Sequence, residues 1–236
     1  MDGGAASRPA GGEESQAGRI GPNAITRFAE ALEASCGAAM KARVIAQAGL
    51  THHLHSPPEA MVAEGDVVAL HRAARALLPP EVFEAVARDA GERTARYLLA
   101  HRIPRAVQRL LRLLPPALAA RVLAGAIARH AWTFVGSGRF RIDRGPPLAF
   151  VIADGPLGCG LHTTAPACGY LAATFEGLFR ELIHPEARVA ERACQAAGTP
   201  ACVFTATWPA GLTRRRRADR GATSRARERA APQPVR

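Results

Sequence analysis

The feature that most constrains this chain is a set of three cysteines and one glutamate between residues 168 and 202. Two residues separate Glu191 from Cys194, and seven separate Cys194 from Cys202. Between Cys168 and Glu191 the apolar residues recur at helical spacing, which predicts an amphipathic helix that ends near His184. Three thiolates and one carboxylate form a closed tetrahedral set that suits zinc and leaves no reactive position. The spacing therefore predicts a structural clamp between the start of a helix and a β-hairpin.

A second interpretation of these residues stays open. The gap between Cys194 and Cys202 is wider than the two to four residues of common zinc knuckles. In one regular strand, Glu191 and Cys194 would point to opposite faces, so a bulge or a helical turn must intervene if both are to reach one ion. Otherwise the cysteines are small buried residues of a hairpin, because free cysteine is among the most buried residue types.

The rest of the chain predicts an α+β fold. Apolar periodicity and prolines indicate N-terminal helices, among them 25–41, 67–78 and 81–102. Residues 140–142 and 148–152 have the character of strands, and the helix from Cys168 and two more strands follow. This order predicts N-terminal helices followed by a ββαββ unit with an antiparallel sheet, braced by zinc. The expected divisions are a disordered leader at 1–18, a helical region at 19–135, a module at 136–210 that packs with the helices as one compact domain, and a disordered Arg-rich tail at 211–236.

The net charge of +11 belongs mostly to the tail. From Thr213 onward, nine arginines face only Asp219 and Glu228, a net of +7 that leaves +4 for the rest of the chain. Such a run with few apolar residues is expected to be disordered. A solubilising extension is the favoured interpretation, and a weak contact of the tail with an anionic membrane surface is the alternative. No specific nucleic-acid partner is expected.

Several classes of protein are excluded by what the sequence lacks. No run of about 18 apolar residues without charge appears, so no membrane span is expected. The first residues do not have the pattern of a secretory signal. An odd number of cysteines, five, argues against a disulfide framework and predicts a reducing cytoplasm. Gly136 and Gly138 are not followed by the third glycine of a dinucleotide-binding loop, and no P-loop is present.

Several motifs carry a family resemblance. Cys168, Glu191-x2-Cys194, Gly198 and Cys202-Val203-Phe204 lie in a segment, 150–208, that resembles the 4-vinyl-reductase domain, a small-molecule-binding module. Residues 19–25, 97–104 and 130–134 extend the resemblance to the bacteriochlorophyll biosynthesis 4-vinyl reductase family. In the sensor members of the domain family the matching set holds zinc. The resemblance therefore implies that Cys168, Glu191, Cys194 and Cys202 are zinc ligands here.

The same resemblance implies a role in bacteriochlorophyll biosynthesis, at the reduction of the 8-vinyl group of a divinyl protochlorophyllide or chlorophyllide. A hydride for that step normally comes from a nicotinamide, flavin or iron–sulfur donor, and zinc is redox-inert. Because no nucleotide-binding loop is found, the hypothesis is a tetrapyrrole carrier or accessory factor. The alternatives are the 8-vinyl (4-vinyl) reductase itself and, third, a small-molecule-sensing regulatory module.

Four residues are candidates for lining a pigment pocket, with a purely structural role as the alternative for each: His130, Trp132, Cys159 and His162. A histidine among them could ligate the central magnesium of the pigment. Other bacteriochlorophyll biosynthesis enzymes are the implied protein partners, and a homodimer is an open alternative. The expected location is the cytoplasm, with a position peripheral to the photosynthetic membrane as a variant of it.

Overall fold

The computed structural model describes residues 18–158 and 160–209 of the 236-residue chain. The predicted leader up to residue 17, the candidate Cys159 and the Arg-rich tail lie outside the described residues. The division of the chain into regions therefore stays a prediction.

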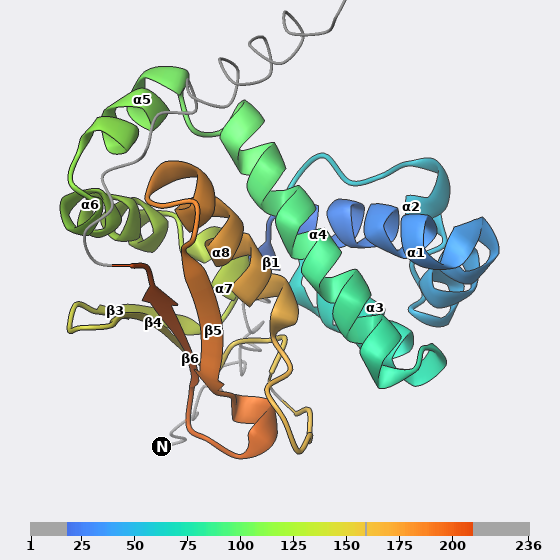
Figure 1. Cartoon of the computed structure of the whole chain (residues 1–236). Helices are drawn as coiled ribbons and strands as arrows, with labels where there is room; N and C mark the ends of the chain where they lie inside the picture. The colour runs from blue at the N-terminus through green and yellow to red at the C-terminus, as the bar shows by residue number, and fades with distance from the viewer. Residues whose placement is uncertain (1–17, 159, 210–236) are drawn as a thin grey trace, which may run out of the picture.

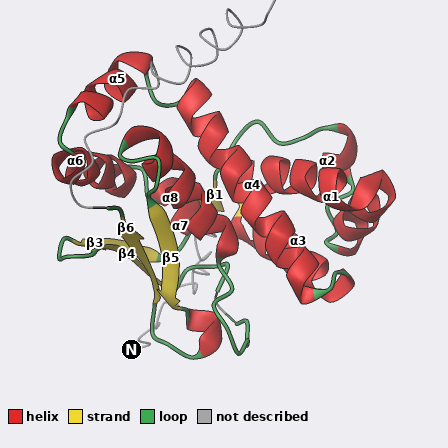
Figure 2. Ribbon diagram, in the orientation of Figure 1, coloured by secondary structure: helices red, strands yellow, loops and turns green. Residues whose placement is uncertain are grey.

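Helices precede and cover a main antiparallel sheet, as Figures 1 and 2 show. The helices are α1 (Asn23–Gln47), α2 (His52–His55), α3 (Glu64–Leu77), α4 (Pro80–His101), α5 (Arg105–Leu113), α6 (Pro116–Arg129), α7 (Trp132–Val135) and α8 (Gly169–Leu182), with a 3₁₀ turn at Gln195–Ala197. The strands are β1 (Arg19–Ile20), β2 (Val62–Ala63), β3 (Arg139–Asp143), β4 (Leu148–Ala153), β5 (Arg188–Ala193) and β6 (Cys202–Thr207). The main sheet has the antiparallel order β3-β4-β6-β5. The α+β class predicted from the sequence is confirmed.

Helix α8 is the centre of the fold, because the sheet covers one of its sides and α4 the other (Figure 1). Toward the sheet, the Phe175 ring lies 4.9 Å from the Phe150 ring and 5.6 Å from the Phe204 ring. Toward α4, the backbones approach so closely that a Cβ on Gly91 would collide with the Tyr170 carbonyl oxygen. Glycine at this position is therefore required by the close approach of the two helices.

The N-terminal region differs from the expectation in two ways. The first helix does not end near Lys41 but continues to Gln47, with a break at Gly37, whose φ of 82° only glycine adopts without strain. The region also contains a two-stranded antiparallel sheet, in which Arg19 pairs with Ala63 and Ile20 with Val62. Strands of two residues are too short to show an alternating pattern, so the sequence could not predict them.

A neutral histidine is buried in the helical part of the core. The His71 ring lies 4.3 Å from the Phe28 ring and 5.9 Å from the Tyr170 ring. Burial, with a smaller contribution from nearby Arg75, lowers the pKa of His71 to about 3. The unfolded chain, in which histidine has a pKa near 6.5, binds this proton more readily than the folded one. The folded state is therefore destabilised as the pH falls from about 6.5 toward 3.

We expect His71→Leu to flatten the acid dependence of stability. Between pH 7 and pH 5 the free energy of unfolding of the unmodified chain should fall by about 2 kcal/mol more than that of the variant. Urea unfolding of both proteins at the two pH values measures this difference, and other titrating groups cancel in the comparison. Equal pH dependence of the two proteins would show that His71 is not buried in its neutral form.

Candidate metal centre

Three separate segments bring four donor side chains to one point. Cys168 is the residue just before α8, Glu191 lies within β5, Cys194 directly follows β5, and Cys202 is the first residue of β6. Their ligand atoms all lie within 4.8 Å of one another. The predicted connection between the start of a helix and a β-hairpin is present in the structure.

An irregularity in β5 lets Glu191 and Cys194 reach the same point. The register against β6 shifts between Glu191, which pairs with Phe204, and Ala193, which pairs with Val203. Such a bulge places one extra residue in a strand and changes the face to which the following side chains point. The bulge that the sequence required for a shared site is therefore confirmed.

The three sulfurs have the spacing of a tetrahedral thiolate centre. Cys168 Sγ lies 3.7 Å from Cys202 Sγ, and Cys202 Sγ lies 3.9 Å from Cys194 Sγ. Zinc–sulfur bonds of about 2.3 Å give a tetrahedral sulfur–sulfur edge of about 3.8 Å. The same distances are far too long for a disulfide bond, whose length is about 2.05 Å. The sulfurs are arranged to share a cation.

The fourth donor has one oxygen to spare. Glu191 Oε2 accepts a hydrogen bond from the Cys168 backbone N–H at 2.8 Å, which fixes the carboxylate. Glu191 Oε1 is buried and has no hydrogen-bond partner. A buried oxygen without a partner costs about 1–3 kcal/mol, and bonding to a cation removes that cost. The donor set therefore fits a metal ion with a preference for thiolate and carboxylate ligands.

The ionisation of the four groups is coupled through short contacts. Hydrogen bonding by Cys168 lowers the pKa of Cys194 to about 4, and backbone N–H groups of Ala167 and Ala196 lower it further. The pKa of Cys168 is raised well above its usual value by its hydrogen bonds to Cys194 and Cys202 and by burial. Burial raises the pKa of Glu191 to about 7. Without a metal, Cys194 is thus the thiolate of the group, and the neighbouring acids hold protons that a metal would displace.

Arg75 of α3 supplies a positive charge beside the site. Its Nη2 donates to the Ala167 carbonyl oxygen at 2.5 Å, and its guanidinium lies 3.9 Å from the centre of the Phe83 ring. Burial lowers the pKa of Arg75, and Cys168 and other acidic groups of the site oppose that shift. Three thiolates, one carboxylate and a divalent ion carry a net charge of −2, which a nearby guanidinium stabilises. Spacing alone could not identify Arg75, because it lies in a distant helix.

The remaining candidates from the sequence lie apart from this cluster. His130 is exposed at the end of α6, where its Nδ1 lies 2.9 Å from the Ala126 carbonyl oxygen. Trp132 is 60% exposed at the start of α7, and His162 is exposed in the loop before α8. Cys159 lies outside the described residues. Their role in lining a pocket stays a prediction.

A groove between α4 and α8 was not foreseen from the sequence. It has a volume of about 300 Å³, and Arg96 and Arg180 lie among its walls. Its other lining residues are Glu92, Ala95, Leu99, Ala173, Glu176, Gly177, Glu181 and Pro185. The signal for it is the set of small residues on the facing sides of two helices, which becomes visible only once the helices are known to pack together.

Comparison with known proteins agrees with this description. The 4-vinyl-reductase domain family matches residues 149–207, which include all four donors. The chain is 47% identical to the bacteriochlorophyll synthase 23 kDa chain of Cereibacter sphaeroides over 186 residues, 79% of this chain and 89% of that protein. It is 41% identical to the protein of the same name from Rhodobacter capsulatus, over 79% of this chain and 85% of that one.

The fold also has a counterpart among solved structures. The crystal structure of an H-NOX protein from S. oneidensis in the Fe(II)NO ligation state superposes with a TM-score of 0.50. The match covers 80% of this chain and 98% of that one at 10% sequence identity. At this identity the similarity concerns the fold alone.

We expect the chain to contain one tightly bound divalent metal ion, and Cys202→Ser to lose most of it. Removal of one thiolate breaks the closed set, so the variant should also unfold at a lower temperature. Metal analysis and thermal unfolding with and without a chelator measure both effects. The matched control is Cys36→Ser, which removes a thiol outside the cluster. Equal metal content in the two variants would contradict a shared site.

We further expect Arg75→Met to weaken metal binding by about ten-fold or more, as is typical for groups that support metal ligands. Arg75→Lys, which keeps the charge, should recover part of the affinity. Competition with a chromophoric chelator gives the dissociation constants. If the Met variant binds metal as tightly as the unmodified chain, the guanidinium does not stabilise the centre.

Proposed function

Because the chain belongs to the family of bacteriochlorophyll synthase 23 kDa chains, we propose that it binds a tetrapyrrole intermediate of bacteriochlorophyll biosynthesis. Membership of this family supports a role in that pathway. The proposed ligand is a divinyl protochlorophyllide or chlorophyllide. As a carrier or accessory factor, the chain would present this pigment while its 8-vinyl group is reduced.

The closed donor set is the observation that carries this proposal. With Cys168, Cys194, Cys202 and Glu191 all directed at one point, a bound ion has four protein ligands and no open position. We propose that the ion is zinc and that it braces the start of α8 against the β5–β6 hairpin. Zinc supplies a rigid tetrahedral anchor and no electrons. A chain with this centre is better suited to hold a substrate than to reduce it.

The groove between α4 and α8 supports a flat ligand with an acidic group. Small residues such as Ala95, Ala173 and Gly177 leave its floor without protruding side chains. Two of its acids are engaged elsewhere: Glu176 accepts from the Val189 N–H at 2.9 Å, and Glu181 pairs with Arg112 at 3.2 Å. The propionate of a tetrapyrrole would then find the arginines of the groove, whose geometry suits carboxylates.

The other candidate functions rest on the family relationship. The 8-vinyl reductase itself is the first alternative, and it requires a separate electron donor. A small-molecule-sensing module is the second. Other bacteriochlorophyll biosynthesis enzymes are the proposed partners, and a cytoplasmic location follows from the cysteine content. None of the helices among the described residues is long and apolar enough to cross a membrane.

We expect protochlorophyllide to show a shifted absorption band on titration with micromolar protein. The double variant Arg96→Gln/Arg180→Gln should bind it about ten-fold more weakly, because a charge-assisted hydrogen bond to the propionate is lost. Arg43→Gln, on exposed α1, is the matched control. No shift at micromolar pigment would remove the carrier function, and an unchanged affinity of the double variant would remove the groove as its site.

A further inference from the structure

Helix α5 packs on the protein by its polar side. Its buried residues are Gln108 and Leu111. Gln108 Nε2 donates to the Leu99 carbonyl oxygen at 2.5 Å and the Ile103 carbonyl oxygen at 2.8 Å, so it satisfies the end of α4. Leu110 and Leu113, in contrast, are 56% and 83% exposed. The apolar stripe of this amphipathic helix is therefore directed away from the core.

Helix α6 extends this apolar surface. Leu118 and Val122 are each 47% exposed, and α6 contacts α5 at the end of the molecule shown at the upper left of Figure 1. The six most exposed large apolar side chains of the described residues all lie between Val107 and Trp132. Scattered exposed leucines are ordinary, whereas their concentration on two adjacent helices indicates an interaction surface.

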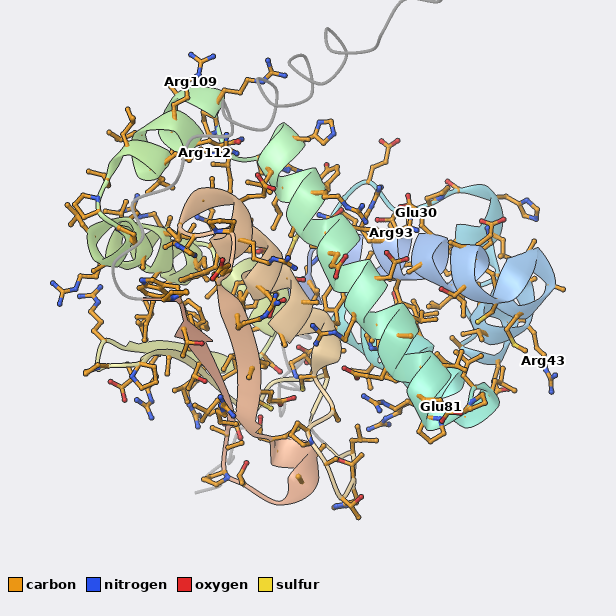
Figure 3. The ribbon with its side chains drawn as sticks, viewed as in Figure 1. Glu30, Arg43, Glu81, Arg93, Arg109 and Arg112 are labelled. Atoms are coloured by element: carbon orange, nitrogen blue, oxygen red, sulfur yellow. The ribbon has the colours of Figure 1, made fainter. Side chains whose placement is uncertain are left out.

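Positive charge without negative charge surrounds these side chains in the sequence. Between Glu92 and Asp143 the chain has ten arginines and no acidic residue. Arg105, Arg109 and Arg121 are exposed on the same two helices. Figure 3 shows Arg109 at the outer edge of α5. A shallow hollow of about 350 Å³ is lined by Arg121, Val122 and Arg144, which places two guanidiniums beside an apolar side chain.

The geometry points to an anionic lipid bilayer as the partner of this α5–α6 face, defined here by Val107, Leu110, Leu113, Leu118 and Val122 with Arg105, Arg109 and Arg121. Helices that lie in a membrane interface combine an apolar stripe with flanking arginines that reach the phosphates. A bilayer accommodates both features at once. The contact stands whether or not the chain binds a tetrapyrrole, and the two are tested separately.

Charge argues against the other occupants of this face. A second copy of the chain would place arginine against arginine across a two-fold axis, and the Arg-rich tail is repelled for the same reason. Duplex nucleic acid would match the arginines but would leave Leu110 and Leu113 in water. The bilayer differs also from the weak contact expected of the tail, because it is made by folded helices and contains an apolar component.

The test is co-sedimentation of the full chain with vesicles of phosphatidylglycerol and phosphatidylcholine, compared with phosphatidylcholine alone. We expect binding to the anionic vesicles that weakens as salt is added. Leu110→Gln/Leu113→Gln should bind roughly ten-fold more weakly, because both leucines leave the interface. A single Leu113→Trp variant should show a blue-shifted emission on binding, which reports insertion without removing any apolar group.

Matched variants separate this face from general basicity. Arg109→Gln should weaken binding, and Arg43→Gln should not, although both remove one charge; Figure 3 shows the two residues at opposite ends of the molecule. Replacing the nine tail arginines with glutamine should leave the leucine effect intact. The inference is overturned if the leucine variant binds like the unmodified chain, if Arg43 and Arg109 matter equally, or if the leucines instead control dimerisation or DNA binding.

Discussion

Four donor atoms from distant parts of the chain meet at the junction of α8 and the β5–β6 hairpin, and the rest of the fold depends on how their charges are balanced. Four ionised acids within 4.8 Å would repel one another strongly in a buried site. In the metal-free chain, protons prevent this, because the pKa of Glu191 rises to about 7 and that of Cys168 rises well above its usual value. A divalent ion replaces those protons and joins the segments directly. Metal binding and the packing of α8 are therefore energetically linked.

The clamp also determines what α8 can present to a ligand. Its first turn is held by Cys168, and its body is packed between the phenylalanines of the sheet and the small residues of α4. Rigid elements position a binding site more accurately than loops do. The groove between α4 and α8 has its floor on this fixed helix, at Ala173 and Gly177. In the proposed function, the metal thus acts on the pigment only through the helix that it braces.

The sequence predicted the local chemistry better than the long-range arrangement. The spacing of Glu191 and Cys194 required a bulge, and β5 contains it, because face alternation in a strand is a strict geometric rule. The contribution of Arg75 could not be predicted, since nothing local in α3 indicates that it will pack beside Ala167. Helical spacing in residues 105–113 predicted a helix correctly but not its orientation. An amphipathic pattern normally indicates that the apolar side is buried, whereas in α5 the needs of the α4 carbonyls place Gln108 inward.

Arginine content alone carries no argument in this protein, because it has 30 arginines and one lysine. What distinguishes one arginine from another is its company. In α4, Arg93 lies 2.8 Å and Arg96 3.6 Å from the carboxylate of Asp89, which gives these side chains a partner within their own helix. On α5 and α6 the chain has no acid to offer, and the residues beside the arginines are outward leucines. A solubilising surface needs charge but has no use for exposed leucines, which lower solubility. The joint occurrence of unbalanced charge and exposed apolar area is therefore the property of a surface that meets a partner with an anionic rim and an apolar interior.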